Sequence, residues 1–504
     1  MSFRDEDIAT LIASPSLGAI TYQACALVEE LEGIKDHHYP SEACRIRDVL
    51  LCVADHVRNE LWGMYDPNSP LTAKDDLDYK RTRLLGGVLR ELYSNLRYLK
   101  ASTPNRSPIA IQQSLARLTE LYFPRAQNGE GVCLIRPQWR YNLKFVRMSE
   151  NLTCLLDVAY LDPEGNLAAT RKAEILPALW ERWIGSRPTS DANATRRQLP
   201  KHFAVLSFAG LDTHDTLLYP LLAHELGHFI IASYEPELHL HEGWRLGDSL
   251  TEQKVRIALE SDGQSVGLPL ISETQVMLVE RAQNCMRELL ADLLAVRMMG
   301  FSFFMAQAEF LKTVTHWQEP SITQGDYPGI RLRLSVVLDY LLNEDTTGNL
   351  KRFLAAPEFR TNHQAAWLLR LLERWQKFLE ESPNRSMRTS VEEHLDNLVS
   401  EAVVESIEWL RETARNVIPD EIAAHLSPKF FERIKLMENV KAPSFLDDDP
   451  RALAEIMSAA WGYQLIYGEE REIQHSEIHG QFGEYKRTCG LCLEALESVL
   501  NASS

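Results

Sequence analysis

The chain has 504 residues, of which 45% are hydrophobic and 25% are charged. This is an ordinary globular composition, which excludes a wholly disordered or fibrous chain. At this length we expect about two or three packed regions rather than one core. The formal net charge of -18 would repel a phosphate backbone, and no basic patch stands out, so nucleic acid is not expected as a partner.

The sequence predicts a protein of the cytoplasm. The N-terminus carries early acidic residues and shows no basic segment followed by an apolar one, so it does not read as a secretory signal. No uninterrupted apolar run reaches the roughly 18 residues that a membrane span needs. The eight cysteines are scattered through a long chain, a pattern typical of reduced thiols rather than of a disulfide framework.

In chain order, four regions are expected, and together they predict a mainly α fold of the α+β class with a small sheet. Apolar residues at helical spacing predict a helical N-terminal region over 1–125. Short apolar stretches and a polar, proline-containing segment predict a small strand-containing region and linker over 126–200. A catalytic core is expected over 201–345, and helical periodicity returns over 346–504.

A short apolar strand is expected, followed by a helix that contains His-Glu-Leu-Gly-His. This helix carries the first candidate metal ligands. Spacing of i and i+4 places His224 and His228 on one face of that helix, where two imidazoles can converge on one cation. Glu225 lies between them in the sequence and can reach a water molecule without binding the metal. The uncharged residues around the motif favour a buried metal helix over two surface histidines flanking an ordinary acid.

A third metal ligand is expected from the segment Arg-Glu-Leu-Leu-Ala-Asp. Glu288 and Asp292 are also spaced i and i+4, and the residues from 289 to 296 other than Asp292 are all Leu, Ala or Val. Two carboxylates in so apolar a helix need partners, since burying an unpaired charge is costly. Glu288 on zinc and Asp292 against a ligand imidazole would satisfy both, whereas the alternative is a solvated acidic stripe.

Together the two motifs resemble the gluzincin metallopeptidases, and the Glu-x-x-x-Asp form is most similar to the soluble catalytic domains of peptidase family M48. The resemblance covers about residues 202–340. It implies a zincin-like core that binds one Zn2+ per chain through His224, His228 and Glu288. It also implies Glu225 as general base and Asp292 as the acceptor for a ligand imidazole.

A weaker similarity follows in Asp-Tyr-Pro-Gly-Ile-Arg-Leu-Arg, which resembles the His-Pro segment and following arginine of M48-like proteins. Tyr327 stands where that segment has histidine. Its hydroxyl is a candidate for stabilising an oxyanion, and the alternative is a loop anchor. Arg331 and Arg333 are further contributors to consider, although solvated or acid-paired arginines are more common.

These residues predict a zinc metallopeptidase that acts on a protein or peptide substrate. A strand at residues 203–209 is expected to hold an extended peptide by β-addition. Two alternatives stay open, a zinc hydrolase of a non-peptide bond and a helical interaction protein whose zinc is structural or vestigial. The helical flanks are expected to restrict access, recruit a protein regulator or mediate oligomerisation.

The C-terminal region contains a second group of residues that bind metals in other proteins. Cys489 and Cys492 form a Cys-x-x-Cys pair, and His475 and His479 lie nearby at i and i+4. A lone Cys-x-x-Cys is weak support for redox or zinc chemistry. The apolar helix that contains the pair favours packed core thiols over a second zinc site.

Overall fold

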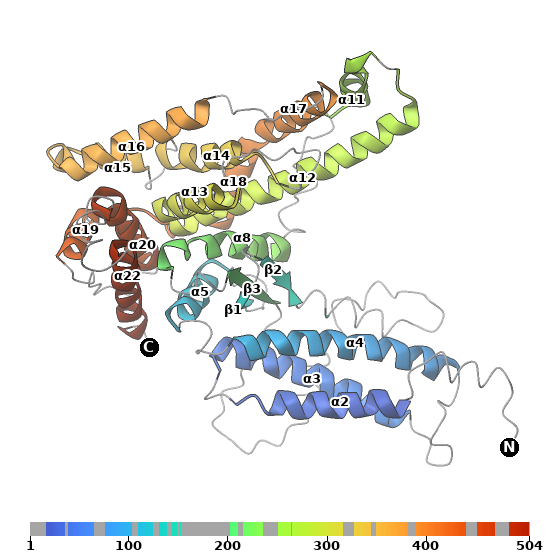
Figure 1. Ribbon diagram of the computed structural model, residues 1–504. Coiled ribbons are helices and arrows are strands. Elements are labelled where there is room, and N and C mark those ends of the chain that lie inside the picture. Colours follow the sequence, from blue (N-terminus) through green and yellow to red (C-terminus); the bar gives the residue numbers. More distant parts are fainter. Residues whose placement is uncertain are drawn as a thin grey trace, which may run out of the picture. The chain divides into compact units, whose positions relative to one another are not determined.

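In the computed structural model, the described part of the chain is mainly helical and contains a small sheet (Figure 1). Among the described residues, no helix combines the length and apolar character that crossing a membrane requires. The described chain divides into two compact units. The described residues are 17–35, 39–64, 76–102, 109–123, 131–138, 144–148, 152, 202–209, 215–234, 250–263, 265–315, 327–343, 349–381, 390–439, 451–468 and 483–502.

The first unit comprises residues 1–112 and 125–210 and contains helices and the sheet. Its core is formed by the apolar faces of three helices together with residues of the sheet such as Leu134 and Phe203. The helices expected in the N-terminal region are present, and Val53 and Leu92 are fully buried in them. Tyr93, expected on the same apolar face as Leu92, is instead exposed. The elements are α2 (Leu17–Glu32), α3 (Ser41–Gly63), α4 (Asp76–Ala101), the first residues of α5 (Ile109–Tyr122), β1 (Gly131–Gln138), β2 (Lys144–Arg147) and β3 (His202–Ala209).

The sheet has three strands in the order β1-β3-β2. Strand β3 pairs in parallel with β1, as in Leu134 against Val205, and antiparallel with β2, as in Val146 against Val205. Both edges of β3 are therefore occupied over residues 204–207, so the expectation that this strand holds a substrate peptide by β-addition is wrong. An incoming strand needs unpaired N–H and C=O groups, and β3 uses its own in the sheet.

The ladder also places β3 with the first unit, although we expected it with the metal-binding helix in one core over 201–345. The rest of the four-region division stays a prediction. Strand β1 and strand β2 begin the region where strands were expected, and the apolar stretch 153–162 with the linker 186–200 lies outside the described residues.

The second unit comprises residues 113–124 and 211–504, and its described elements are helices. Its longest element, α12, packs against α8, α13, α14, α17, α18 and α20. The elements are η3 (Thr216–Leu218), α8 (Leu221–Tyr234), α11 (Glu252–Leu259), η4 (Glu260–Asp262), α12 (Leu268–Met299), α13 (Phe301–Thr315), α14 (Ile330–Asn343), α15 (Leu350–Leu354), η5 (Pro357–Phe359), α16 (His363–Glu380), α17 (Ser390–Glu405), α18 (Ile407–Val417), α19 (Phe430–Glu438), α20 (Ala452–Tyr463), the π-helical η6 (Gln464–Gly468) and α22 (Gly483–Ala502).

The C-terminal end of α12 is fixed by a buried arginine. Arg297 is fully buried and donates hydrogen bonds to the carbonyl oxygen of Ile418, the hydroxyl of Tyr340 and the carboxylate of Asp420. Gly300 then adopts a φ of 58°, a left-handed conformation that glycine reaches without steric cost, and the chain turns directly into α13. Long-range contacts therefore anchor the helix that carries Glu288.

Candidate metal centre

Helix α8 carries the His-Glu-Leu-Gly-His motif, as the sequence predicts. Most of its residues are buried, including Leu226, Phe229 and Ile230, which are at most 2% exposed. A helix surrounded by other elements has few positions for polar groups, so its two histidines need polar partners inside the protein. His224 is buried, and His228 is partly exposed.

Helices α8 and α12 approach each other closely at Gly227. A Cβ atom at this position would lie 3.1 Å from both the Cα atom and the carbonyl oxygen of Ala291. Glycine in the motif and alanine in the facing helix therefore permit a contact that larger side chains would prevent. The consequence is that one turn of α8 faces the turn of α12 that carries Glu288 and Asp292.

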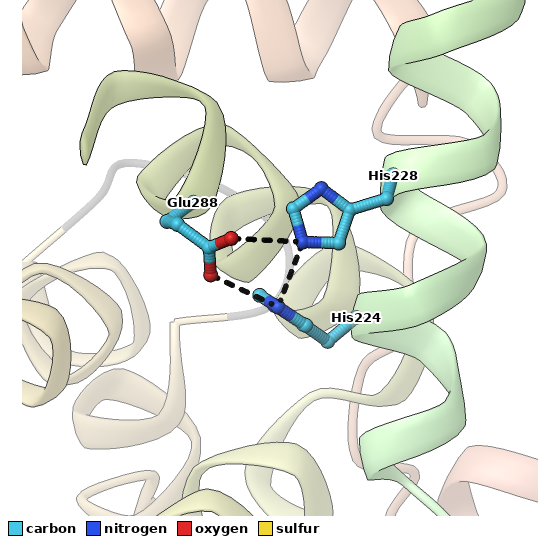
Figure 2. Close-up of side chains that lie close together, drawn as sticks. All are labelled: His224, His228 and Glu288. Carbon is cyan, nitrogen blue, oxygen red and sulfur yellow. Dashed lines mark hydrogen bonds and ion pairs between the residues drawn. The ribbon is translucent and has the colours of Figure 1, made fainter. Parts of the chain in front are cut away.

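Three side chains from these two helices converge (Figure 2). His224 Nε2 lies 3.1 Å from His228 Nε2. Glu288 Oε2 lies 3.4 Å from His224 Nε2, and Glu288 Oε1 lies 3.3 Å from His228 Nε2. Each residue thus offers one ligand atom, and the three atoms lie within 4.8 Å of one another. The group could hold a metal ion.

Asp292 contacts the other side of His224. Its Oδ1 lies 2.8 Å from His224 Nδ1, although the direction of the N–H bond falls outside hydrogen-bond geometry. The carboxylate also accepts hydrogen bonds from Arg333 Nε at 2.7 Å and from Gln307 Nε2 at 2.7 Å. Asp292 is fully buried, so these contacts compensate its charge. The structure therefore places Asp292 beside a ligand imidazole, with Nε2 left for the metal.

The charges of the two carboxylates control the protonation of the metal-free site. Burial alone would lower the pKa of His224, but the neighbouring Asp292 and Glu288 raise it to about 10. Burial would raise the pKa of Glu288, but contacts with His224 and His228 hold it well below its usual range. For Asp292, Arg333 and His224 outweigh burial and lower the pKa. Both carboxylates are thus charged and available as acceptors at neutral pH.

The donor set fits a cation. Glu288 Oε2 is buried and has no hydrogen-bond partner, although a carboxylate oxygen normally finds one. The nearest charged nitrogen of Arg333 is 3.6 Å away, which is too long for a hydrogen bond. Two imidazole nitrogens and this oxygen face one another from two rigid helices. A positive ion between them would supply the missing partner and relieve the close approach of the two rings.

The remaining candidates, Glu225, Tyr327 and Arg331, are not members of this three-residue group. Glu225 directly follows His224 on α8 and is 7% exposed. Tyr327 lies shortly before the start of α14 in the sequence and is 55% exposed. Burial would lower the pKa of Arg333, but Asp292, with smaller contributions from Glu288 and Tyr327, raises it. Arg331 instead donates hydrogen bonds to the carbonyl oxygens of Phe378 and Glu381.

Sequence reasoning missed Gln307. This residue is 2% exposed on α13 and donates to Asp292. The available signal was a polar amide within the apolar run Phe-Ser-Phe-Phe-Met-Ala-Gln-Ala. The pair His475 and His479 lies outside the described residues. Cys489 and Cys492 are buried in α22, in agreement with the expectation of packed thiols.

The resemblance to gluzincins stays a prediction from the two sequence motifs that helices α8 and α12 carry. Comparison with protein-family models, with curated proteins and with solved structures finds no match for this chain.

Proposed function

We propose that the chain is a zinc-dependent metallopeptidase with a zincin-like catalytic core, acting on a protein or peptide substrate. The observation that carries the proposal is the convergence of His224, His228 and Glu288 from the two motif-bearing helices, with Asp292 behind His224. This pairing of a His-Glu-x-x-His helix with a Glu-x-x-x-Asp helix supports a catalytic site more than an incidental cluster, because each polar residue in it has a distinct task.

Zinc is the ion that the ligand set favours. Two imidazoles and one carboxylate are a common zinc set in hydrolases, and three protein ligands keep a fourth position for water or substrate. A structural zinc site would normally be closed by four protein ligands. A zinc ion bound here supplies a Lewis acid and lowers the pKa of a water molecule toward about 7.

Two residues of the chain are proposed to act on the substrate. Glu225 would accept a proton from the attacking water and deliver it to the leaving amine, a task that requires a carboxylate beside the metal but not bound to it. Tyr327 would donate its hydroxyl hydrogen to the developing oxyanion. Its exposure of 55% is compatible with meeting a substrate. Asp292, Arg333 and Gln307 would hold His224 in one orientation.

The test replaces the proposed base and keeps the metal. We expect Glu225→Gln to retain zinc and to lose about 100-fold to 10,000-fold of the cleavage rate on an unfolded protein substrate. Glu280→Gln on the exposed face of α12 is the matched control, and it should cleave like the wild type. Zinc content and cleavage would be measured on the same preparations.

Other outcomes distinguish the alternatives. Turnover of small esters or amides alone, abolished in Glu225→Gln, would replace the peptidase by a zinc hydrolase of a non-peptide bond. A wild-type chain that binds zinc but turns over neither class would favour a structural or vestigial site. Undiminished cleavage in Glu225→Gln would show that Glu225 is not the base.

A further inference from the structure

The start of the metal-binding helix is held by two helices from the far end of the chain. The short helix η3 immediately precedes α8. Thr216 Oγ1 donates to the carbonyl oxygen of Cys489 on α22 at 3.1 Å, and Trp461 Nε1 on α20 donates to the carbonyl oxygen of Leu217 at 2.9 Å. Thr216 and Leu217 are fully buried, so these bonds lie inside the second unit.

A third contact joins α22 to the residue before η3. The Tyr485 hydroxyl lies 3.0 Å from each carboxylate oxygen of Asp215, to which it donates a hydrogen bond. The Cys489 thiol lies 3.7 Å from the same carboxylate. Asp215 and Tyr485 are both partly buried. A hydrogen bond to a charged acceptor, sheltered from water, is stronger than one between neutral groups.

Backbone hydrogen bonds link these contacts to the turn of α8 that carries the first metal ligand. Leu218 N–H donates to Asp215 O, and Tyr219 N–H donates to Thr216 O. Leu222 N–H then donates to Tyr219 O at 2.9 Å. His224 follows within the same turn of α8. Because helical turns joined in this way move together, a shift of residues 215–217 would displace the imidazole of His224 relative to Glu288.

We propose that Tyr485 and Trp461 are positioning residues of the metal centre, which fix the start of α8 so that its histidines meet Glu288. The inference rests on the metal site of the proposed function but not on peptidase activity. It gives the C-terminal helices α20 and α22 a task that the metal motifs themselves do not indicate. Cys489 takes part through its backbone carbonyl oxygen, which accepts from Thr216, and not through the thiol of the Cys-x-x-Cys pair.

The two thiols of the Cys-x-x-Cys pair are suited to packing inside the protein. Burial raises the pKa of Cys489 and of Cys492 to about 12, so both stay protonated at neutral pH. A protonated, buried thiol is a poor nucleophile and a poor metal ligand.

The experiment measures zinc affinity and unfolding temperature of the full chain, with zinc alone as the probe. Tyr485→Phe removes the hydroxyl that donates a hydrogen bond to Asp215. Trp461→Phe removes the indole N–H that donates to Leu217 but keeps an aromatic ring. We expect each to weaken zinc binding by about tenfold, the effect of one lost hydrogen bond to a charged or buried acceptor. In the cobalt-substituted protein, the visible spectrum of each variant should depart from that of the wild type.

The matched control is Tyr463→Phe. Tyr463 is buried on α20 and its hydroxyl donates to Glu484, the neighbour of Tyr485 on α22. Tyr463→Phe should lower the unfolding temperature of the zinc-free protein at least as much as Tyr485→Phe does. Its zinc affinity should stay within about twofold of that of the wild type.

Zinc affinity unchanged in both Tyr485→Phe and Trp461→Phe would overturn the inference while leaving the metal site intact. Equal weakening in Tyr463→Phe would also overturn it, because the effect would then follow general loss of stability. A wild-type chain that binds no zinc would overturn the metal site itself and the inference with it.

Discussion

Asp292 is a buried carboxylate with three polar neighbours at once. It lies against His224, accepts two hydrogen bonds from Arg333 at 2.7 and 2.8 Å, and accepts one from Gln307. The fork of a guanidinium matches a carboxylate better than the single ammonium of lysine does. Arg333 therefore compensates most of the charge that makes Asp292 useful to the histidine.

Arg333→Met is expected to disturb both stability and metal binding. The variant keeps an apolar stem of similar length but removes the guanidinium that compensates most of the charge of Asp292, which costs roughly 3 kcal/mol of the free energy of unfolding. Zinc affinity should fall by about tenfold to 100-fold, as for other outer partners of metal ligands. Denaturant unfolding of the zinc-free chain and zinc titration would measure the two effects.

Arg331→Met is the matched control for that change. Arg331 lies two residues away on the same helix and contacts the end of α16, so its loss should alter stability with zinc affinity unchanged. If Arg331→Met and Arg333→Met weakened zinc binding equally, Arg333 would have no particular role at the site.

The raised pKa of His224 predicts how zinc binding depends on pH. Because Asp292 and Glu288 raise the pKa of His224 to about 10, the metal-free protein carries this proton at pH 7. Zinc requires the neutral ring, so binding at pH 7 should release about one proton from His224, and affinity should increase as the pH rises toward 10. Calorimetry in buffers of different ionisation enthalpy counts the protons. Release that is the same in Asp292→Asn would contradict this cause of the raised pKa.

At the scale of elements, the site depends on the distance between α8 and α12. Neither helix holds all three ligands, so the separation of the two axes sets whether the imidazoles reach Glu288. Gly227 and Ala291 set that separation, with 3.1 Å between the added Cβ and the facing backbone. That space is tighter than ordinary van der Waals contact, so even one methyl group requires a shift.

Gly227→Ala should weaken zinc binding by at least about tenfold although every ligand is retained. The new methyl pushes the helices apart, while the higher helix propensity of alanine stabilises α8 by up to about 1 kcal/mol and so opposes unfolding. Zinc titration of the full chain measures the effect. Gly87→Ala in α4, where a Cβ meets nothing within 4 Å, should leave zinc affinity unchanged. Wild-type affinity in Gly227→Ala would show that the helices can adjust.

Sequence patterns predicted the helices of the site better than the strand that precedes them in the sequence. Spacing of i and i+4 is a local property, so the sequence alone places the histidine pair on one helical face and the carboxylate pair on another. Strand pairing is non-local, and a single apolar run such as residues 202–209 does not indicate whether its edges are occupied. The expectation of β-addition failed for that reason.

At the scale of the whole molecule, the metal ligands belong to one of two compact units. All three ligands, with Asp292, Arg333 and Gln307, lie in the unit of residues 113–124 and 211–504. The other unit has its own core of helices and sheet, in which Leu50 is fully buried. Stability of that core and affinity for the metal therefore depend on different sets of contacts.

Leu50→Ala should cost about 2 to 5 kcal/mol of the free energy of unfolding of the first unit, through lost apolar contacts and a cavity. Zinc affinity of the chain should stay within about twofold of the wild type, since the variant touches no residue of the second unit's metal site. Thermal unfolding and zinc titration on one preparation test both statements. A parallel fall of zinc affinity would show that the first unit supports the site.

Several parts of the molecule were beyond sequence reasoning because they join residues far apart in the chain. The Arg333 fork on Asp292 spans two helices, and Gln307 comes from a third. The hydrogen bond of Tyr485 to Asp215 joins residues 270 positions apart in the sequence, and that of Trp461 to Leu217 joins residues 244 positions apart. A pattern search registers a polar residue in an apolar run, but it gives no indication of which distant group that residue meets.

The most direct measurement is the zinc content of the purified full chain, prepared without chelators, in the wild type, Glu288→Ala and Glu280→Ala. If His224, His228 and Glu288 hold the metal, the wild type and the exposed-site control Glu280→Ala carry one zinc per chain. Glu288→Ala then binds it at least about tenfold more weakly. No zinc in the wild type, or equal retention in Glu288→Ala, would contradict the metal centre.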